Sequence, residues 1–201
     1  PSHLSGAAFG PGFVWGCSTS AFQIEGASTA DGRVDSIWDV FCRQPGAIRD
    51  GADGSVACDH YHLWERDLDL AASLNISAYR FSIAWPRVYG DGGEQANAAG
   101  LAFYSRLVDG MLARGLVPWA TLYHWDTPLE LDEAGGWMNR DTAYRLGEFA
   151  AIAAAAYGDR VTRWVTVNEP ATVSTNGYML GMHAPGEALM LKALPSVHHQ
   201  L

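Results

Sequence analysis

The sequence has little positive charge. Its 201 residues include 13 lysine and arginine residues against 22 aspartate and glutamate residues, which gives a formal net charge of -9. A nucleic-acid surface needs clustered basic side chains to neutralise phosphates, and here the basic residues are scattered. The composition therefore argues against a nucleic-acid partner.

The sequence also lacks a long apolar run. The longest, residues 149–157, is rich in alanine and far shorter than the roughly 20 residues that a membrane-spanning helix requires. The first residues, Pro1 to Leu4, show neither the basic nor the apolar region of a secretory signal. We therefore expect no membrane partner and no signal peptide.

Cysteine and glycine-rich motifs are scarce as well. Cys17, Cys42 and Cys58 contain no Cys-x-x-Cys pair, which disfavours a disulfide framework or a zinc site and fits a reducing cytoplasm. No phosphate-binding G-x-G-x-x-G or G-x-x-x-x-G-K-[ST] loop is present. His60 and His62 stand two residues apart, so on a helix they point to different faces. The sequence therefore predicts no cofactor and no metal.

What the sequence does contain is an alternation of strand and helix patterns. Strands are predicted at residues 13–19, 78–83, 116–123 and 164–168, and helices at residues 57–74, 101–114 and 141–157. Within the second strand, Tyr79, Phe81 and Ile83 alternate with Arg80 and Ser82. Strands separated by helices indicate a parallel α/β protein with right-handed crossovers.

Polar residues gather where the predicted strands end. They are Gln23, Arg80, Ser82, His124, Asn168 and Glu169. In a (β/α)8 barrel, residues at the carboxyl ends of strands are the catalytic ones. A barrel needs eight strands over typically ~250 residues, so four strands predict the first four β/α units. We expect residues 1–201 to form the N-terminal half of one barrel domain, without a second domain.

Six motifs then carry a resemblance to a known family. In chain order they are FVWG with TSAFQIEG (13–16, 19–26), SIWD (36–39), YRFSIAWPR (79–87), TLYHWD (121–126), TVNEP (166–170) and HAPG (183–186). Together they closely resemble the motifs of glycoside hydrolase family 1, the β-glucosidase family. The resemblance implies a (β/α)8 TIM barrel, hydrolysis of terminal β-D-glucosyl residues, and a β-glucoside or short β-linked oligosaccharide as substrate.

By this resemblance, Glu169 is the acid/base of a retaining, double-displacement mechanism. Such an acid must hold its proton near neutral pH, which burial and a neighbouring anion achieve. A nucleophilic carboxylate is needed about 5 to 5.5 Å away. The family carries it in an I/V-T-E-N-G motif, and this sequence has none. The alternative for Glu169 is a strand-end carboxylate in a structural ion pair.

The resemblance assigns the other site residues too. Asn168 matches the residue that binds the sugar 2-hydroxyl, and Gln23, His124 and Trp125 match those that bind other hydroxyls of the same sugar. Arg80 matches the arginine beside the nucleophile. Without the family, Asn168 would satisfy strand-end backbone groups, His124 would be a buried histidine and Arg80 would form a structural ion pair. Two further carboxylates, Glu25 and Asp126, are expected to order loops.

Three alternatives stay open. A 6-phospho-β-glycosidase would recognise its phosphate through residues that this chain lacks, and a non-catalytic half barrel would only bind sugar or assemble. A thioglucosidase is disfavoured because plant members replace the acid/base with Gln. Ala171 stands where the family usually has a large aromatic residue, which would open the leaving-group side. A half barrel has unpaired edges, so we expect it to pair with the complementary C-terminal half or to self-associate.

Overall fold

The protein is described by a computed structural model that covers residues 9–90 and 95–201. Pro1 to Leu4, on which the prediction of no signal peptide rests, lie outside the described residues. Within the described part, no helix is both long enough and apolar enough to cross a membrane.

The centre of the fold is a four-stranded parallel sheet. Its strands are β1 (Gly16–Ser18), β2 (Ala78–Ser82), β3 (Val117–Tyr123) and β4 (Arg163–Val167). Their order in the sheet is their order in the chain. The long helices between them are α3 (His60–Ser73), α5 (Ala98–Ala113) and α7 (Asp141–Tyr157). The structure confirms the predicted strand and helix alternation and has the arrangement of the first units of a (β/α)8 barrel.

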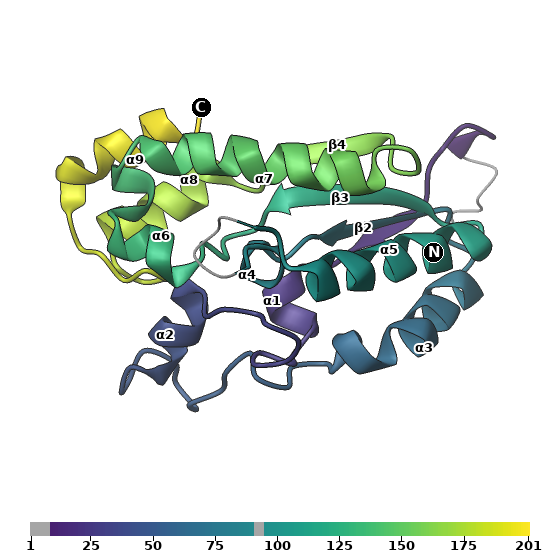
Figure 1. Cartoon of the computed structure of the whole chain (residues 1–201), viewed down its shortest axis with the longest axis horizontal. Coiled ribbons are helices and arrows are strands. Elements are labelled where there is room, and N and C mark those ends of the chain that lie inside the picture. Colours follow the sequence, from purple (N-terminus) through teal and green to yellow (C-terminus); the bar gives the residue numbers. More distant parts are fainter. Residues whose placement is uncertain (1–8, 91–94) are drawn as a thin grey trace, which may run out of the picture.

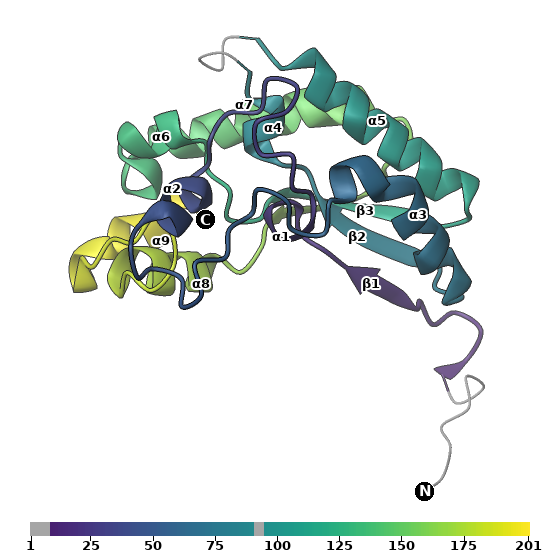
Figure 2. The same ribbon diagram turned by 90° about the horizontal axis from the view of Figure 1, so that it is seen from below.

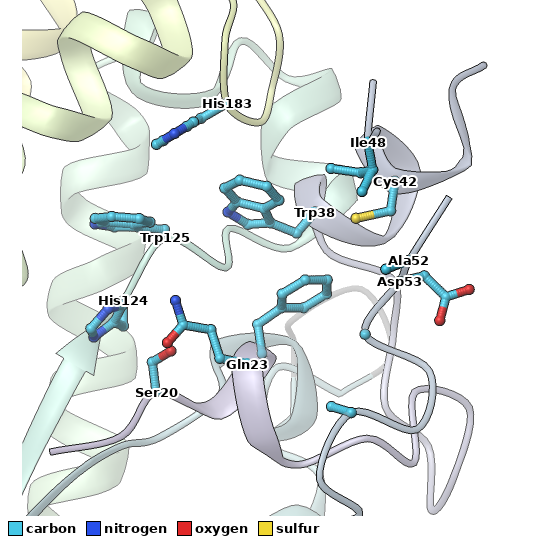
Figure 3. A pocket seen from close by; sticks show the side chains of 13 residues that line it. Ser20, Gln23, Trp38, Cys42, Ile48, Ala52, Asp53, His124, Trp125 and His183 are labelled. Carbon is cyan, nitrogen blue, oxygen red and sulfur yellow. The ribbon is translucent and has the colours of Figure 1, made fainter. Parts of the chain in front are cut away.

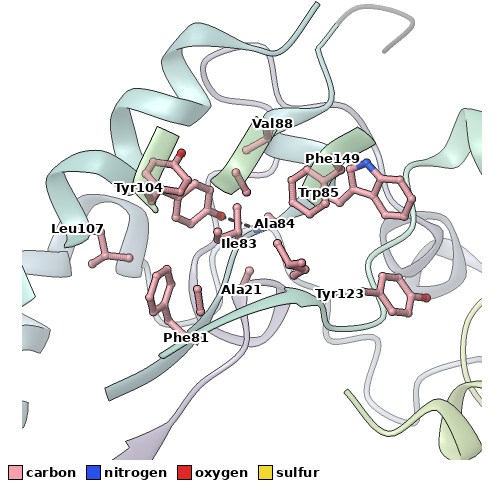
Figure 4. Packing of buried hydrophobic residues seen from close by; sticks show 14 of the residues in the cluster. Ala21, Phe81, Ile83, Ala84, Trp85, Val88, Tyr104, Leu107, Tyr123 and Phe149 are labelled. Carbon is pink, nitrogen blue, oxygen red and sulfur yellow. Dashed lines mark hydrogen bonds between the residues drawn. The ribbon is translucent and has the colours of Figure 1, made fainter. Parts of the chain in front are cut away.

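The three long helices cover one face of the sheet (Figures 1 and 2). The core lies between this face and the helices, where Phe81 of β2 and Ile83 just after it meet Tyr104 and Leu107 of α5 (Figure 4). The buried Tyr104 hydroxyl accepts a hydrogen bond from the backbone N–H of Ala84 at 2.7 Å. Because successive side chains point to opposite faces of a strand, Tyr79, Phe81 and Ile83 all lie on the face that the helices cover.

Shorter elements gather beyond the carboxyl ends of the strands (Figure 1). They comprise α1 (Ala21–Ile24), α2 (Ile37–Arg43), α4 (Trp85–Val88), α6 (Leu129–Glu133), η3 (Gly136–Met138), α8 (Pro170–Thr172), η4 (Val173–Met179), η5 (Met190–Ala193) and α9 (Leu194–His199). Of these, η4 is a π-helix, a form that is rare and often found at functional sites. This end of the sheet is where the predicted site residues lie.

Several predicted boundaries are confirmed. Helix α7 spans the predicted residues 141–157. Its N-cap residue, Arg140, has no side-chain cap, and Asn139, one residue earlier, accepts the first backbone N–H of the helix, that of Asp141, at 3.0 Å. Helix α3 ends at Ser73, and Asn75 beyond it has a φ of 56°. A left-handed residue there terminates the helix.

Three predicted starts are wrong by three residues. Helix α5 was predicted from residue 101 and begins at Ala98, because the Asn97 side chain accepts the backbone N–H of Ala99 at 3.1 Å and caps the helix there. The first strand was predicted over residues 13–19, whereas β1 covers only Gly16–Ser18 because only these residues pair with β2. Helix α3 was predicted from residue 57 and begins at His60, because Ala57 and Asp59 both have positive φ values that a right-handed helix cannot include.

The outer strands of the sheet are exposed. Strand β1 and strand β4 have one neighbour each, and all three residues of β1 are exposed. Three aromatic side chains cluster just before β1, with ring centroids 4.7 to 5.0 Å apart, and each is at least 40% exposed: Phe9, Phe13 and Trp15. The predicted unpaired edges are therefore present in the described part of the chain.

Candidate active site

The site begins where β4 ends. Asn168 continues the strand by donating its backbone N–H to the Tyr123 carbonyl of β3 at 2.9 Å. Glu169 then turns into the left-handed region, with φ 48° and ψ 60°, and Pro170 opens α8. A non-glycine residue in this region is uncommon and costs energy. The turn separates the two adjacent side chains, so that Asn168 is buried and Glu169 is exposed.

Asn168 joins residues from the two inner strands. Its Oδ1 accepts a hydrogen bond from Nη2 of Arg80 at 2.6 Å, and its Nδ2 lies 3.2 Å from Nε2 of His124. Its backbone carbonyl accepts the indole N–H of Trp125 at 2.8 Å. Three predicted site residues thus converge on a fourth.

This network fixes the proton on His124. An arginine can only donate, so the Asn168 atom facing Arg80 is the oxygen and the atom facing His124 is the amide nitrogen. That nitrogen donates, so Nε2 of His124 accepts and the neutral ring carries its proton on Nδ1. Burial and, to a smaller extent, the positive charge of Arg80 lower the pKa of His124 to about 4, while Glu169 opposes the shift.

Trp125 is held in a strained conformation beside His124. Its φ of 76° places a bulky residue in the left-handed region, and the hydrogen bond from its indole to Asn168 compensates in part. Two residues further on, the carbonyl of Thr127 accepts a hydrogen bond from the backbone N–H of Ile37, the first residue of α2, at 3.0 Å. The corner after β3 is therefore fixed from both sides.

Arg80 projects from the face of β2 opposite the core. Besides Asn168, it contacts Thr121 of β3, whose Oγ1 accepts the Arg80 Nε–H at 2.9 Å. Within the described residues Arg80 makes no salt bridge with a carboxylate. The alternative of a structural ion pair therefore has no partner in this part of the chain.

Glu169 differs from its prediction in one respect. Burial was expected for a proton-holding acid, but the Glu169 side chain is exposed, and the Thr172 hydroxyl donates to its Oε2 at 3.0 Å. The reason is its position on an outer strand, which has a neighbour on one side only. No ion pair of Glu169 exists within the described residues.

A cavity of about 440 Å³ opens beside this network. Three predicted residues line it, namely Gln23, His124 and Trp125, and Figure 3 shows Gln23 reaching toward His124. Phe22, Trp38 and His183 add aromatic surfaces to its wall. Trp38 and Trp125 flank His183, with ring centroids 5.6 and 5.8 Å away. A polar corner with aromatic walls suits a sugar ring, whose hydroxyls form hydrogen bonds and whose faces are apolar.

The structure brings most of the predicted residues together. Arg80, His124, Trp125 and Asn168 are connected by hydrogen bonds, and Gln23 shares the cavity with His124 and Trp125. Glu169 adjoins Asn168 in the chain but is not among the residues that line the cavity.

Sequence reasoning overlooked four contributors. Phe22, Trp38, Thr121 and His183 all occurred in recognised motifs but received no role. Their motif positions were a usable signal. The contact of Thr121 with Arg80 also depends on the strand register, which places Thr121 opposite Ser82.

The carboxylate Glu25 orders a loop, as expected. Its Oε2 accepts from Nε of Arg87 at 2.9 Å and its Oε1 accepts from the Tyr104 hydroxyl at 2.6 Å. Both members of the ion pair are buried. This contact ties α1, and with it Gln23, to the segment after β2. Removing one member of a buried ion pair leaves the other charge uncompensated and is costly.

The two closely spaced histidines, His60 and His62, lie in the first turn of α3, and each contacts an aspartate. Nδ1 of His60 lies 2.6 Å from Asp67, and Nδ1 of His62 lies 2.6 Å from Asp59. Across the described residues, no group of three or more histidine, cysteine or acidic side chains is placed to hold a metal ion.

With this geometry established, the chain can be compared with known proteins. Residues 5–201 match the family model described as glycosyl hydrolase family 1. The β-glucosidase of an Agrobacterium species is 49% identical over 193 residues, which are 96% of this chain and 42% of that protein. β-Glucosidase A of Thermotoga maritima is 44% identical over 193 residues, again 96% of this chain and 43% of that protein.

Solved structures of β-glucosidases also resemble this chain. The β-glucosidase of Thermotoga maritima in complex with castanospermine superposes with a TM-score of 0.93 at 43% identity, covering 96% of this chain and 44% of that chain. The psychrophilic β-glucosidase of Micrococcus antarcticus gives a TM-score of 0.91 at 50% identity, covering 94% of this chain and 40% of that chain.

The parallel units and the cluster at their carboxyl ends define the class as the barrel type of glycoside hydrolase. More specifically, the chain belongs to glycosyl hydrolase family 1. It spans about 42 to 43% of the length of these two relatives.

Proposed function

We propose that this chain is the acid/base-bearing N-terminal half of a retaining β-glucosidase. In this proposal Glu169 protonates the leaving oxygen and later deprotonates water, and a carboxylate outside this chain is the nucleophile. The observation that carries the proposal is the convergence of Arg80, His124 and Trp125 on Asn168, directly before Glu169. The β-glucosidase relatives support the substrate class.

The site residues divide the work between binding and chemistry. Gln23, His124 and Trp125 bind hydroxyls of the glucosyl residue, and Asn168 binds its 2-hydroxyl, a contact that strengthens as an oxocarbenium-like state forms. Arg80 provides a fixed positive charge that keeps the nucleophile ionised. The substrate is a β-glucoside or a short β-linked oligosaccharide. Two of the structural relatives are complexes with castanospermine and glucoimidazole, which supports a sugar-sized ligand.

Residues 1–201 form one half of a single barrel domain in this proposal. The single neighbour of β1 and of β4, and the exposed aromatic cluster before β1, support a partner that covers them. That partner is the complementary C-terminal half, or a second copy of this chain when the half is absent. We use the term assembled barrel for the full-length protein that carries this chain, or for this chain recombined with the complementary half.

The test compares this chain with the assembled barrel on an aryl β-glucoside. Turnover should appear only in the assembled barrel, and Glu169→Gln should reduce it by about 10²- to 10⁴-fold, the usual contribution of a general acid/base. Glu148→Gln on α7 is the matched control and should leave turnover unchanged. Turnover that is insensitive to Glu169→Gln would refute the assignment, and sugar binding without turnover would favour a non-catalytic module.

The association of the halves has its own measurement. Light scattering and thermal melting of this chain alone should show self-association or a non-cooperative transition, because its outer strands lack neighbours. A monodisperse monomer that melts cooperatively would contradict this part of the proposal.

A further inference from the structure

Asp126, the residue after Trp125, has a carboxyl group that the proposed mechanism does not use. It is only 1% exposed, and neither of its oxygens has a hydrogen-bond partner of ordinary geometry within the described residues. Burial raises the pKa of Asp126 to about 7, although the backbone N–H groups of Asp126 and His124 and the charge of Arg33 oppose the shift. A buried carboxyl group without a partner is costly, so its surroundings must supply one.

The surroundings contain a small polar cavity. Its volume is about 10 Å³, and its lining includes Asp126, Arg33, Glu25 and Gly26. This size is at the lower limit for holding one water molecule. A sugar or any other organic ligand is too large, so the chemical class of ligand that fits is water.

The groups around such a water differ in the hydrogen bonds that they can still form. Each oxygen of Glu25 already accepts one hydrogen bond, Oε2 from Arg87 and Oε1 from Tyr104, and keeps a second lone pair. Arg33 makes three hydrogen bonds, to Ser28, Val34 and Asp39. A guanidinium has five N–H donors, so Arg33 retains donors for another acceptor. Arg33 and Asp126 form no direct salt bridge in the described part of the chain.

The position of this cavity connects two parts of the site. Arg33 belongs to the segment between α1 and α2 and is fixed by its 2.8 Å ion pair with Asp39, both side chains being 5% exposed. Asp126 adjoins the strained Trp125, whose indole holds Asn168. A contact across the cavity would anchor the corner that contains His124 and Trp125 to the α1–α2 segment.

We propose that Asp126 holds one ordered water molecule against Arg33, and that this water-mediated contact positions the corner formed by His124 and Trp125. Asp126 is thus a positioning residue that acts through Trp125 and does not touch the sugar. The inference rests on the proposed function for the identity of the ligand at that corner. The water site itself depends only on the geometry of Asp126, Arg33 and the cavity.

The first test is a high-resolution crystal structure of the assembled barrel. It should show one water within hydrogen-bond distance of both Asp126 and Arg33. A direct ion pair between Asp126 and Arg33 would overturn the proposal, and so would a cavity without ordered density.

The second test measures binding of castanospermine by calorimetry in the assembled barrel. Asp126→Asn keeps a polar group that can bond the water, so affinity should stay within about twofold, whereas Asp126→Leu should weaken it about tenfold, or about 1.4 kcal/mol. Asp132→Leu on α6 alters another partly buried carboxyl group and should leave affinity unchanged.

The outcomes separate water bridging from other roles. If Asp126→Asn binds as weakly as Asp126→Leu, a negative charge is required and the proposal fails. If Asp126→Leu binds like the wild type, the corner needs no such anchor and the positioning role fails. If Asp126→Leu does not fold, the Asn variant and the crystal structure still decide.

A double-mutant cycle tests the route of the effect. Asp126→Leu and His124→Ala should be strongly non-additive in castanospermine affinity, because the first acts through the corner that the second disables. Additive losses would contradict positioning through this corner. These binding measurements do not depend on Glu169. A failure of the proposed function would instead appear as full turnover in Glu169→Gln, with the water and the coupling intact.

Discussion

The inner strands of the sheet, β2 and β3, differ from the outer strands, β1 and β4, in how they hold the site residues. Arg80 on β2 and His124 after β3 are at least partly buried and fixed by neighbours. Gln23 after β1 and Glu169 after β4 are exposed. The corner that we propose binds the sugar is therefore organised within this chain, whereas Glu169, the proposed acid/base, is exposed at the end of a strand with one neighbour. The difference follows from the number of neighbouring strands.

Asn168 shows that position on an outer strand is not the whole explanation. It follows β4 directly, and it is buried because its side chain turns toward Arg80 and His124 of the inner strands. Its neighbour Glu169 takes a left-handed conformation and is exposed. Contact with an inner strand, and not sequence position, decides whether a site residue is organised in this chain.

The largest expected effect concerns the core beneath the inner strands. Phe81→Ala should lower the free energy of unfolding of the assembled barrel by about 3 to 5 kcal/mol, because it leaves a cavity where a 3% exposed ring was. Tyr144→Ala, an aromatic truncation at a 62% exposed position on α7, should change it by no more than about 0.5 kcal/mol. Urea denaturation measures both. Equal losses would break the distinction between core and surface.

The next effect concerns the residue that joins inner and outer strands. Asn168→Ala should reduce kcat/KM of the assembled barrel by about 10²-fold, a loss typical of a preorganised hydrogen-bonding group. Asn139→Ala removes the cap of α7 and should cost about 1 kcal/mol of stability without changing kcat/KM. Steady-state kinetics on an aryl β-glucoside distinguish the two. An unchanged kcat/KM in Asn168→Ala would show that the network is only structural.

A smaller effect should come from Thr121. Thr121→Val keeps the shape of the side chain and removes the acceptor of the Arg80 Nε–H, which should lower kcat/KM by up to about tenfold through loss of one hydrogen bond. Thr166→Val on β4, where the side chain is exposed, is the matched substitution. Similar kinetics for both variants would mean that Arg80 is positioned without Thr121.

The smallest effect is a pH dependence of stability. The pKa of His124 is lowered to about 4 in the folded protein, mainly by burial, from an ordinary value near 6.5. Above pH 6.5 the ring is neutral in both states and its titration does not affect stability, but between pH 6.5 and 4 the unfolded chain binds a proton that the folded protein does not, so stability falls as the pH falls. Between pH 7 and 5.5 the loss should be about 1 kcal/mol. His124→Gln should remove it in urea titrations, and an unchanged slope would contradict the assignment of a neutral ring.

The sequence predicted the regular parts of the fold well, for physical reasons. Alternation in β2 is clear because one face meets the core and the other carries Arg80 and Ser82. Helix α7 has its predicted ends because the Asn139 side chain accepts the first backbone N–H of the helix and Gly158 is its C-cap residue. Strand β1 was overestimated because apolar residues 13–15 resemble a buried strand, although they lie before the pairing begins.

The site could be predicted in its residues but not in its geometry. Motifs identified Gln23, Arg80, His124, Trp125, Asn168 and Glu169, and the structure shows how four of them are joined. The left-handed conformations of Trp125 and Glu169 could not be predicted, because neither residue is a glycine. The exposure of Glu169 and the isolation of Asp126 depend on packing between segments distant in sequence, which local patterns do not encode.

The most direct test of the central claim is azide rescue of Glu169→Ala in the assembled barrel. With a β-glucoside whose leaving group needs no protonation, the first step of the retaining mechanism still proceeds, but water attacks the glycosyl-enzyme slowly because its general base is gone. Azide needs no base, so it should accelerate turnover and yield β-glucosyl azide with retained configuration. Unchanged turnover with azide, in a variant that still binds castanospermine, would contradict the assignment of Glu169 as the acid/base.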